Sequence, residues 1–155
     1  MYASQIHRIL SSGKDATKYF IGVFASDTLP SVREEATIVV NTDTHDQEGS
    51  HWLAMHIQDK KHLQFFDSYG FPPTAYGVFI SSYSQQFTNI KWNKIHLQSS
   101  SSNVYGYNCV FFILKISKGY TMDCILHDFD RNKQNDFRLY QYFKKRYNVN
   151  MVFTK

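Results

Sequence analysis

The chain has 155 residues and a formal net charge of +4, with 17% aromatic and 19% charged residues. This length fits one domain spanning residues 1–155, and the high apolar content excludes an intrinsically disordered chain. No apolar run reaches the roughly 18 residues of a membrane span, and the first residues lack the basic and then apolar order of a secretory signal, so we expect a soluble intracellular protein.

The first half of the sequence predicts a helix followed by strands. The helix ends near Gly13, and the apolar stretch after it runs into a turn at Leu29 and Pro30. Gln58–His62 separates two strand-like runs by a distance typical of an antiparallel hairpin. In chain order we expect a helix over residues 4–12, an apolar stretch over 18–24, a strand over 36–41, a polar loop over 42–50, and strands over 52–57 and 63–66.

The second half predicts mainly helices. Tyr69–Pro73 is a strong chain break. The turn residues Gly106 and Asn108 stand just before a nearly all-apolar run, which fits a buried helix with Cys109 in its first turn. In chain order we expect a helix over residues 75–87, a strand over 90–97, a polar loop over 98–103, the buried helix over 109–116, and helices over 121–129 and 135–147.

The predicted hairpin brings a histidine and an aspartate together. A register that places Ile57 opposite Lys61 also places His51 opposite Asp67. Directly opposed residues have Cβ atoms about 4.5–5.5 Å apart, close enough for a carboxylate to accept a hydrogen bond from an imidazole. Because side chains alternate along a strand, one face carries His51, Leu53, Met55, Leu63, Phe65 and Asp67.

This pair predicts an oriented general base. A carboxylate fixes one tautomer of the imidazole and leaves the other ring nitrogen free to take a proton. Cys109 fits the role of nucleophile, because the positive end of a helix dipole favours a thiolate. The alternative for Cys109 is a small buried apolar residue, and we assign that role to Cys124, which has no activating base beside it.

A metal site is not expected. Histidines 45, 51, 56 and 62 lie in one region, but His51 and His56 differ by an odd number and point to opposite faces of a strand. No His-Glu-x-x-His helix and no Cys/His cluster occur in the sequence. No glycine-rich phosphate loop is present either, so we expect no metal and no nucleotide cofactor.

These motifs resemble the adenain-like cysteine proteases, which are the adenovirus maturation proteases and belong to the clan of the SUMO-specific proteases. The resemblance is carried, in this order, by Gly49-Ser50-His51-Trp52, Phe66-Asp67-Ser68-Tyr69-Gly70 and Gly106-Tyr107-Asn108-Cys109. The sequence is more similar still to the proteases of Polinton/Maverick elements and virophages, through Gly22-Val23-Phe24, Asp27-x-Leu29-Pro30, Val40-Asn41-Thr42-Asp43 and Leu97-Gln98-Ser99. The resemblance spans roughly residues 20–115.

The resemblance implies an α+β papain-like fold, in which a mixed, mostly antiparallel sheet packs with helices and the catalytic cysteine stands at a buried helix N-terminus. It implies His51 as general base, Asp67 as its orienting acid and Cys109 as nucleophile. The implied activity is that of an endopeptidase that cleaves viral or transposon-encoded capsid precursors through a thioester, after Gly or other small residues. We expect a monomer with a protein substrate.

The resemblance also points to an oxyanion donor and to substrate-binding residues. Gln98 precedes Cys109 by eleven positions, a spacing that the Polinton-type relatives share, whereas Asn103 stands six positions before it, as the donor does in adenovirus and SUMO proteases. Trp52 and Gly49 flank His51 and are expected at the substrate cleft, although an aromatic beside a strand is as often ordinary core. Asp27 resembles an acidic residue near that cleft, and its alternative is a simple turn residue.

The positive charge is concentrated at the C-terminal end. Residues 131–155 carry seven Lys or Arg and a single acidic residue, Asp136. This segment is compatible with contact to DNA, as in adenovirus protease, which is stimulated by DNA and a viral peptide; the alternative is a solvated helix face.

Two other functions compete with capsid processing. One is a protease for SUMO or ubiquitin-like modifiers, which would use the same triad. The other is a non-catalytic nucleic-acid or capsid-binding module, which has no chemical reason to keep all three triad residue types in order. The capsid-processing hypothesis places the protein in the host cytoplasm or nucleus and in the virion.

Overall fold

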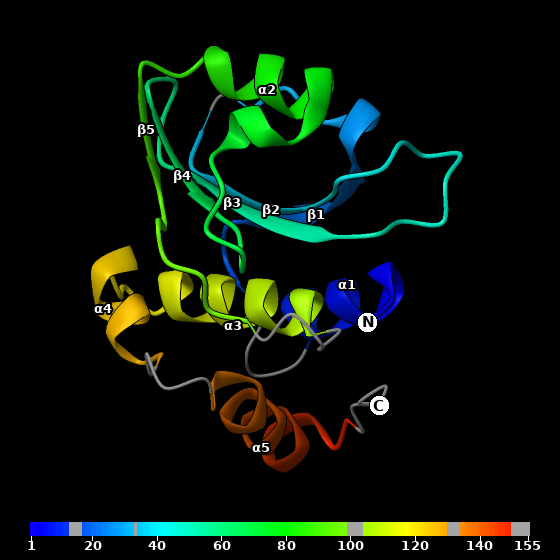
Figure 1. The fold of residues 1–155 in the computed structure, drawn as a ribbon, viewed down its shortest axis with the longest axis vertical. Helices are drawn as coiled ribbons and strands as arrows, with labels where there is room; N and C mark the ends of the chain where they lie inside the picture. Colours follow the sequence, from blue (N-terminus) through cyan, green and yellow to red (C-terminus); the bar gives the residue numbers. More distant parts are fainter. Residues whose placement is uncertain (13–16, 33, 99–103, 130–133, 150–155) are drawn as a thin grey trace.

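The computed structural model describes residues 1–12, 17–32, 34–98, 104–129 and 134–149. Figure 1 shows a central sheet with helices on both faces. Its five strands are β1 (Phe20–Ala25), β2 (Ala36–Asn41), β3 (Trp52–Ile57), β4 (His62–Phe66) and β5 (Asn89–Trp92). The helices are α1 (Ala3–Ser11), α2 (Gly77–Gln85), α3 (Tyr105–Ser117), α4 (Met122–His127) and α5 (Asn135–Tyr147), with short 3₁₀ turns η2 (Ser26–Thr28) and η3 (Pro73–Ala75).

The sheet has the order β1-β2-β3-β4-β5 and is mixed, with two parallel and two antiparallel strand pairs. β1 with β2 and β4 with β5 are parallel, whereas β3 is antiparallel to both of its neighbours. The prediction of a mostly antiparallel sheet is therefore wrong. The chain passes from β4 to β5 through α2. Such a helical crossover allows two consecutive strands to run parallel.

Two apolar layers hold the helices on the sheet. On one face Leu53, Met55 and Phe65 pack with Ile80 of α2. On the other face Ala54 and Phe66 pack against α1 and α3, where the rings of Phe66 and Phe112 stack with centroids 4.6 Å apart. In Figure 1 α2 lies above the sheet, α1 and α3 lie below it, and α5 lies beyond α3. Buried neighbours on β3 and β4 thus alternate between the two layers, as the period of a strand requires.

The hairpin of β3 and β4 forms as predicted, but its register differs by two residues. Ile57 pairs with Leu63, not with Lys61. A shift of two residues preserves the alternation of faces, so the predicted apolar face remains intact. The observed register places Asp67 beyond the last pair of the ladder, diagonal to His51.

The extent of β5 and the start of α3 also differ from the sequence-based predictions. β5 is shorter than predicted, because Asn93 directly after it turns its side chain to the backbone of Asp67. Helix α3 begins at Tyr105, four residues before Cys109, so the predicted position of Cys109 in the first turn is wrong. Helix α5 has the predicted bounds. No helix within the described ranges is long and apolar enough to cross a membrane.

Candidate active site

The predicted contact between His51 and Asp67 is present at the end of the hairpin. His51 directly precedes β3 and Asp67 directly follows β4. The imidazole Nε2 lies 2.7 Å from Oδ1 of the carboxylate. The Asp67 side chain is fully buried, and that of His51 is 9% exposed. A hydrogen bond to a carboxylate at this depth assigns the proton to Nε2 and fixes the plane of the ring.

Four donors surround the Asp67 carboxylate. Oδ1 also accepts the backbone N–H of Tyr69 at 3.1 Å, while Oδ2 accepts the backbone N–H of Phe71 at 2.9 Å and the hydroxyl of Tyr76 at 2.6 Å. Burial alone would raise the pKa of this carboxyl, but the hydrogen bonds, led by those from His51 and Tyr76, outweigh it and hold the pKa below its ordinary value. Asp67 is therefore ionised at neutral pH.

The turn that carries Asp67 is held by a neighbouring segment. The backbone N–H of Asp67 donates to Oδ1 of the fully buried Asn93 at 2.8 Å, and Asn93 Nδ2 donates to the Asp67 carbonyl. Gly70, at φ +78°, lets the turn approach the 93–97 segment, because a Cβ there would lie 2.8 Å from the carbonyl carbon of Ile95. Sequence reasoning missed Asn93; its only signal is a polar residue inside a predicted strand.

Three tyrosine rings enclose the imidazole of His51. Tyr69 and Tyr76 stack on it with centroids 5.0 Å and 5.7 Å away, and Tyr105 meets it edge-on at 4.7 Å. The Tyr69 hydroxyl donates to that of Tyr105 at 2.8 Å. Within the described part of the chain, the buried Nδ1 of His51 has no hydrogen-bond partner. The ring is thus fixed through Nε2 and leaves Nδ1 available as a base.

Cys109 lies one helical turn after Tyr105, on the same side of α3. Its side chain is fully buried. Burial, and then the negative charge of Asp67, raise the pKa of the thiol well above its ordinary value. The predicted stabilisation of a thiolate by the helix N-terminus is therefore wrong for this conformation, because Cys109 stands past the first turn and in an apolar layer.

The structure describes one of the two candidate oxyanion donors. Gln98 is buried and lies against α3, where Asn108 Nδ2 is 3.5 Å from its Oε1. Asn103 is outside the described residues. The backbone N–H of Cys109 belongs to the fifth residue of α3, whereas only the first four N–H groups of a helix lack partners within it. Of the predicted donors, the described structure brings the Gln98 side chain to the N-terminal part of α3.

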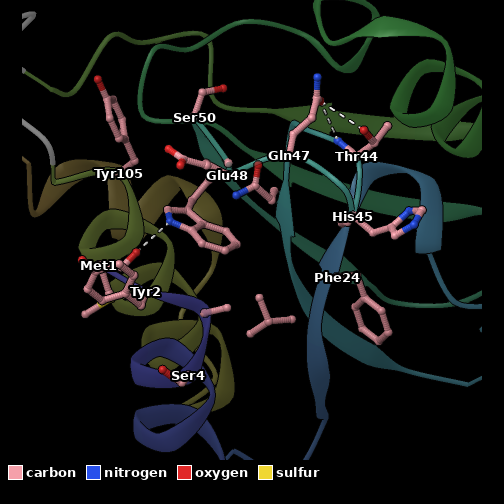
Figure 2. A pocket seen from close by; sticks show the side chains of 16 residues that line it. Met1, Tyr2, Ser4, Phe24, Thr44, His45, Gln47, Glu48, Ser50 and Tyr105 are labelled. Carbon is pink, nitrogen blue, oxygen red and sulfur yellow. Dashed lines mark hydrogen bonds between the residues drawn. The ribbon is translucent and has the colours of Figure 1, made fainter.

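A cavity of about 840 Å³ opens between α1, β1, the loop from β2 to β3 and the start of α3. Ser50 and Trp52, on either side of His51 in the sequence, line this cavity beside His51, whereas His51 and Cys109 are not among its lining residues. Trp52 and Gly49 line it. Figure 2 shows Tyr105, Met1 and His45 around the same cavity. The Trp52 indole donates to the Met1 carbonyl at 3.1 Å. Two of the three predicted substrate-binding residues, Trp52 and Gly49, thus lie at one cavity.

The third, Asp27, does not line this cavity but holds a residue that does. Its Oδ1 accepts the backbone N–H of His45 at 2.9 Å, and its Oδ2 lies 2.5 Å from the imidazole Nδ1 of His45. The hydrogen bond with His45 lowers the pKa of Asp27, and it raises the pKa of His45. Both oxygens of Asp27 are therefore used to fasten the loop between β2 and β3.

His56, His62 and the second cysteine lie apart from this site, whereas His96 meets the ring of Tyr69 edge-on with centroids 5.3 Å apart. His56 pairs with Glu35 and His62 with Asp59. Cys124 is exposed on α4, so its assignment as a small buried apolar residue is wrong. The described residues contain no group of three or more His, Cys, Asp and Glu side chains arranged to hold a metal ion.

Comparison with known proteins shows a shared fold. No protein-family model matches the sequence, and no curated protein sequence matches it. Among solved structures, the ASFV pS273R protease superposes with a TM-score of 0.53 at 13% identity over 79% of this chain. The central domain of the uncharacterized Lpg1148 protein from Legionella pneumophila gives a TM-score of 0.54 at 11% identity, covering 94% of this chain and 95% of that domain. The chain spans 58% of the length of the ASFV protease.

Proposed function

We propose that the protein is a cysteine peptidase that cleaves its substrate through a thioester on Cys109. The observation that carries this proposal is the buried Nδ1 of His51, which has no hydrogen-bond partner among the described residues, while Nε2 is fixed on an ionised Asp67. A purely structural histidine at this depth would use both ring nitrogens. The fold shared with the ASFV pS273R protease supports the same activity.

In the proposed reaction Nδ1 of His51 takes the proton from the Cys109 thiol as the sulfur attacks the scissile carbonyl. The C–N bond then breaks, and the imidazolium gives its proton to the leaving amine. Water, deprotonated by the same nitrogen, attacks the thioester and releases the acid product and the free thiol. Asp67 stabilises the imidazolium in both steps. The Gln98 amide is the proposed donor to the oxyanion, with Asn103 as its rival.

The cavity beside His51 is the proposed peptide cleft. Its walls include Trp52, Gly49 and Tyr105. Because the Cys109 thiol is fully buried in the structure, the proposal requires that a bound peptide expose it. The raised pKa of the thiol fits such a resting state, in which the nucleophile stays protonated until substrate arrives.

We assign the substrate class by resemblance to the Polinton, virophage and adenovirus enzymes. The proposed substrates are capsid precursors cut after Gly or other small residues, inside the host cell or the virion. Helix α5 carries Lys144, Lys145 and Arg146 in its last turn, which is the proposed contact for DNA.

The test is cleavage of matched substrates by the wild type and Cys109→Ala, with Cys124→Ala as the control for loss of a thiol. Gly-containing capsid-type peptides and SUMO or ubiquitin fusions are offered in parallel. We expect cleavage of the capsid-type peptides by the wild type and Cys124→Ala and none by Cys109→Ala. Selective cleavage of the fusions would assign the protein to modifier processing, and equal activity of Cys109→Ala and the wild type would refute the proposed nucleophile.

A further inference from the structure

The side chain of Tyr76 touches both members of the His51–Asp67 pair and lies outside the predicted triad. Its hydroxyl donates to Asp67 Oδ2 at 2.6 Å, and its ring stacks on the imidazole with an interplanar angle of 19°. No motif in the sequence marked this residue. It follows the η3 turn, and its own backbone N–H donates to the Pro73 carbonyl at 3.2 Å, which fixes its position at the start of α2.

The hydroxyl of Tyr76 acts on a different oxygen from the one that binds His51. Oδ1 faces the imidazole, whereas Oδ2 accepts the Tyr76 hydroxyl and one backbone N–H. A donor on Oδ2 fixes the rotation of the carboxylate about its own bond and so aims Oδ1 at Nε2. Burial, and then the bond to Asp67, raise the pKa of Tyr76, so the phenol remains a donor throughout the neutral and mildly alkaline range.

We propose that Tyr76 is a positioning residue of the peptidase, whose hydroxyl aims the Asp67 carboxylate at His51 while its ring holds the imidazole plane. This inference rests on the proposed function. The role differs from that of a general packing residue, because it depends on a single oxygen atom. Removal of that atom should change the electrostatics of the pair and leave the stacked ring in place.

Tyr69 provides a matched control for this test. Its ring also stacks on His51, at an interplanar angle of 20°, but its hydroxyl donates to Tyr105 and not to Asp67. Tyr76→Phe and Tyr69→Phe therefore remove the same atom from two tyrosines that stack on the same imidazole, and only the first removes a donor from the carboxylate.

Two measurements separate this inference from the peptidase assignment. The first needs no substrate: a ¹³C-carboxyl NMR titration of Asp67, assigned with Asp67→Asn, together with the Nε2 proton resonance of His51. We expect Tyr76→Phe to raise the pKa of Asp67 and to shift the Nε2 proton, and Tyr69→Phe to change neither, with circular dichroism unchanged in both. An unchanged Asp67 titration in Tyr76→Phe, or the same shift in both variants, overturns the proposal.

The second measurement is peptide cleavage. A hydrogen bond to a charged group corresponds to about a 10- to 100-fold effect, so we expect Tyr76→Phe to lower kcat by that factor with KM little changed. A wild-type kcat in Tyr76→Phe would overturn the positioning role even if the titration shifts. A wild type without any peptidase activity would refute the proposed function, and the titration would still decide whether Tyr76 controls the carboxylate.

Discussion

Two histidine–carboxylate pairs stand at β3, and they differ in what the second ring nitrogen does. At one end of the strand His51 Nε2 binds Asp67 at 2.7 Å, and at the other His56 Nε2 binds Glu35 at 2.9 Å. Nδ1 of His56 lies 3.2 Å from Oε1 of Gln64, its cross-strand partner, whereas Nδ1 of His51 is buried and makes no hydrogen bond to any described residue.

The difference distinguishes a structural pair from the pair that we propose transfers a proton. A buried polar atom without a partner costs stability, so a histidine that only supports the fold uses both nitrogens, as His56 does. The carboxylates differ in the same sense: Asp67 is fully buried, whereas the Glu35 side chain is 40% exposed. A nearby imidazole and carboxylate are therefore not sufficient evidence of catalysis; the unpartnered second nitrogen is the distinguishing feature.

The largest expected effect comes from removing the two imidazoles in turn. His51→Ala should lower kcat/KM by about 10⁴-fold or more, because it removes the proposed base for Cys109. His56→Ala should keep activity near that of the wild type and lower the thermal midpoint of unfolding, because it removes two partly buried hydrogen bonds. Peptide cleavage and thermal unfolding of both variants check this contrast, and equal activity losses would mean that the two pairs do not differ in function.

The carboxylates should show the same contrast on a smaller scale. Asp67→Asn preserves the shape but favours the wrong tautomer of His51, and should lower kcat by about 100- to 10,000-fold. Glu35→Gln should have little effect on kcat. Steady-state kinetics of the two variants would contradict the comparison if Asp67→Asn were as active as the wild type.

The acid stability of Asp67→Asn tests the same carboxylate without substrate. Because the pKa of Asp67 is lowered in the folded protein, its ionisation stabilises the fold above the ordinary carboxyl pKa, and this contribution is lost as the pH falls through the folded value. Urea unfolding between pH 6 and the acid range should therefore show a weaker pH dependence in Asp67→Asn. An identical pH dependence would show that Asp67 is not held ionised by the fold.

The Gln98 amide can be compared with His51 and Asp67, because a general base without an oxyanion donor is a poor catalyst. Gln98→Ala should lower kcat by about 100- to 1000-fold with KM little changed. Asn103→Ala should have a smaller effect. If the kinetics come out in the opposite order, Asn103 is the donor and the spacing of the adenovirus and SUMO proteases applies.

The smallest expected effect concerns the two thiols in the free protein. Cys109 is buried with a raised pKa, whereas Cys124 is exposed. Iodoacetamide at pH 8 should therefore modify Cys124 at least about 10-fold faster than Cys109, since the thiolate is the reactive form. Peptide mapping by mass spectrometry measures both rates, and faster modification of Cys109 would show that the site is open without substrate.

The contact of His51 with Asp67 could be predicted from sequence because strand alternation tolerates the error in register. The position of Cys109 could not, because Gly106 and Asn108 are typical turn residues. In the structure Gly106 and Asn108 are buried within α3, and Asn108 Nδ2 donates to the Val104 carbonyl at 3.2 Å. Asn93 and Tyr76 reach Asp67 through contacts that no periodic pattern records, since each depends on how a loop after the hairpin folds back.

The most direct test of the central claim is a peptide that ends in Gly and carries a vinyl sulfone in place of the scissile bond. Mass spectrometry of the digested adduct identifies the modified residue. We expect one adduct, on Cys109, in the wild type and in His56→Ala, and at most slow formation in His51→Ala, because a bound peptide opens the site and Nδ1 of His51 then activates the thiol. Modification of Cys124 alone, or equal modification of Cys109 in His51→Ala, would contradict the account.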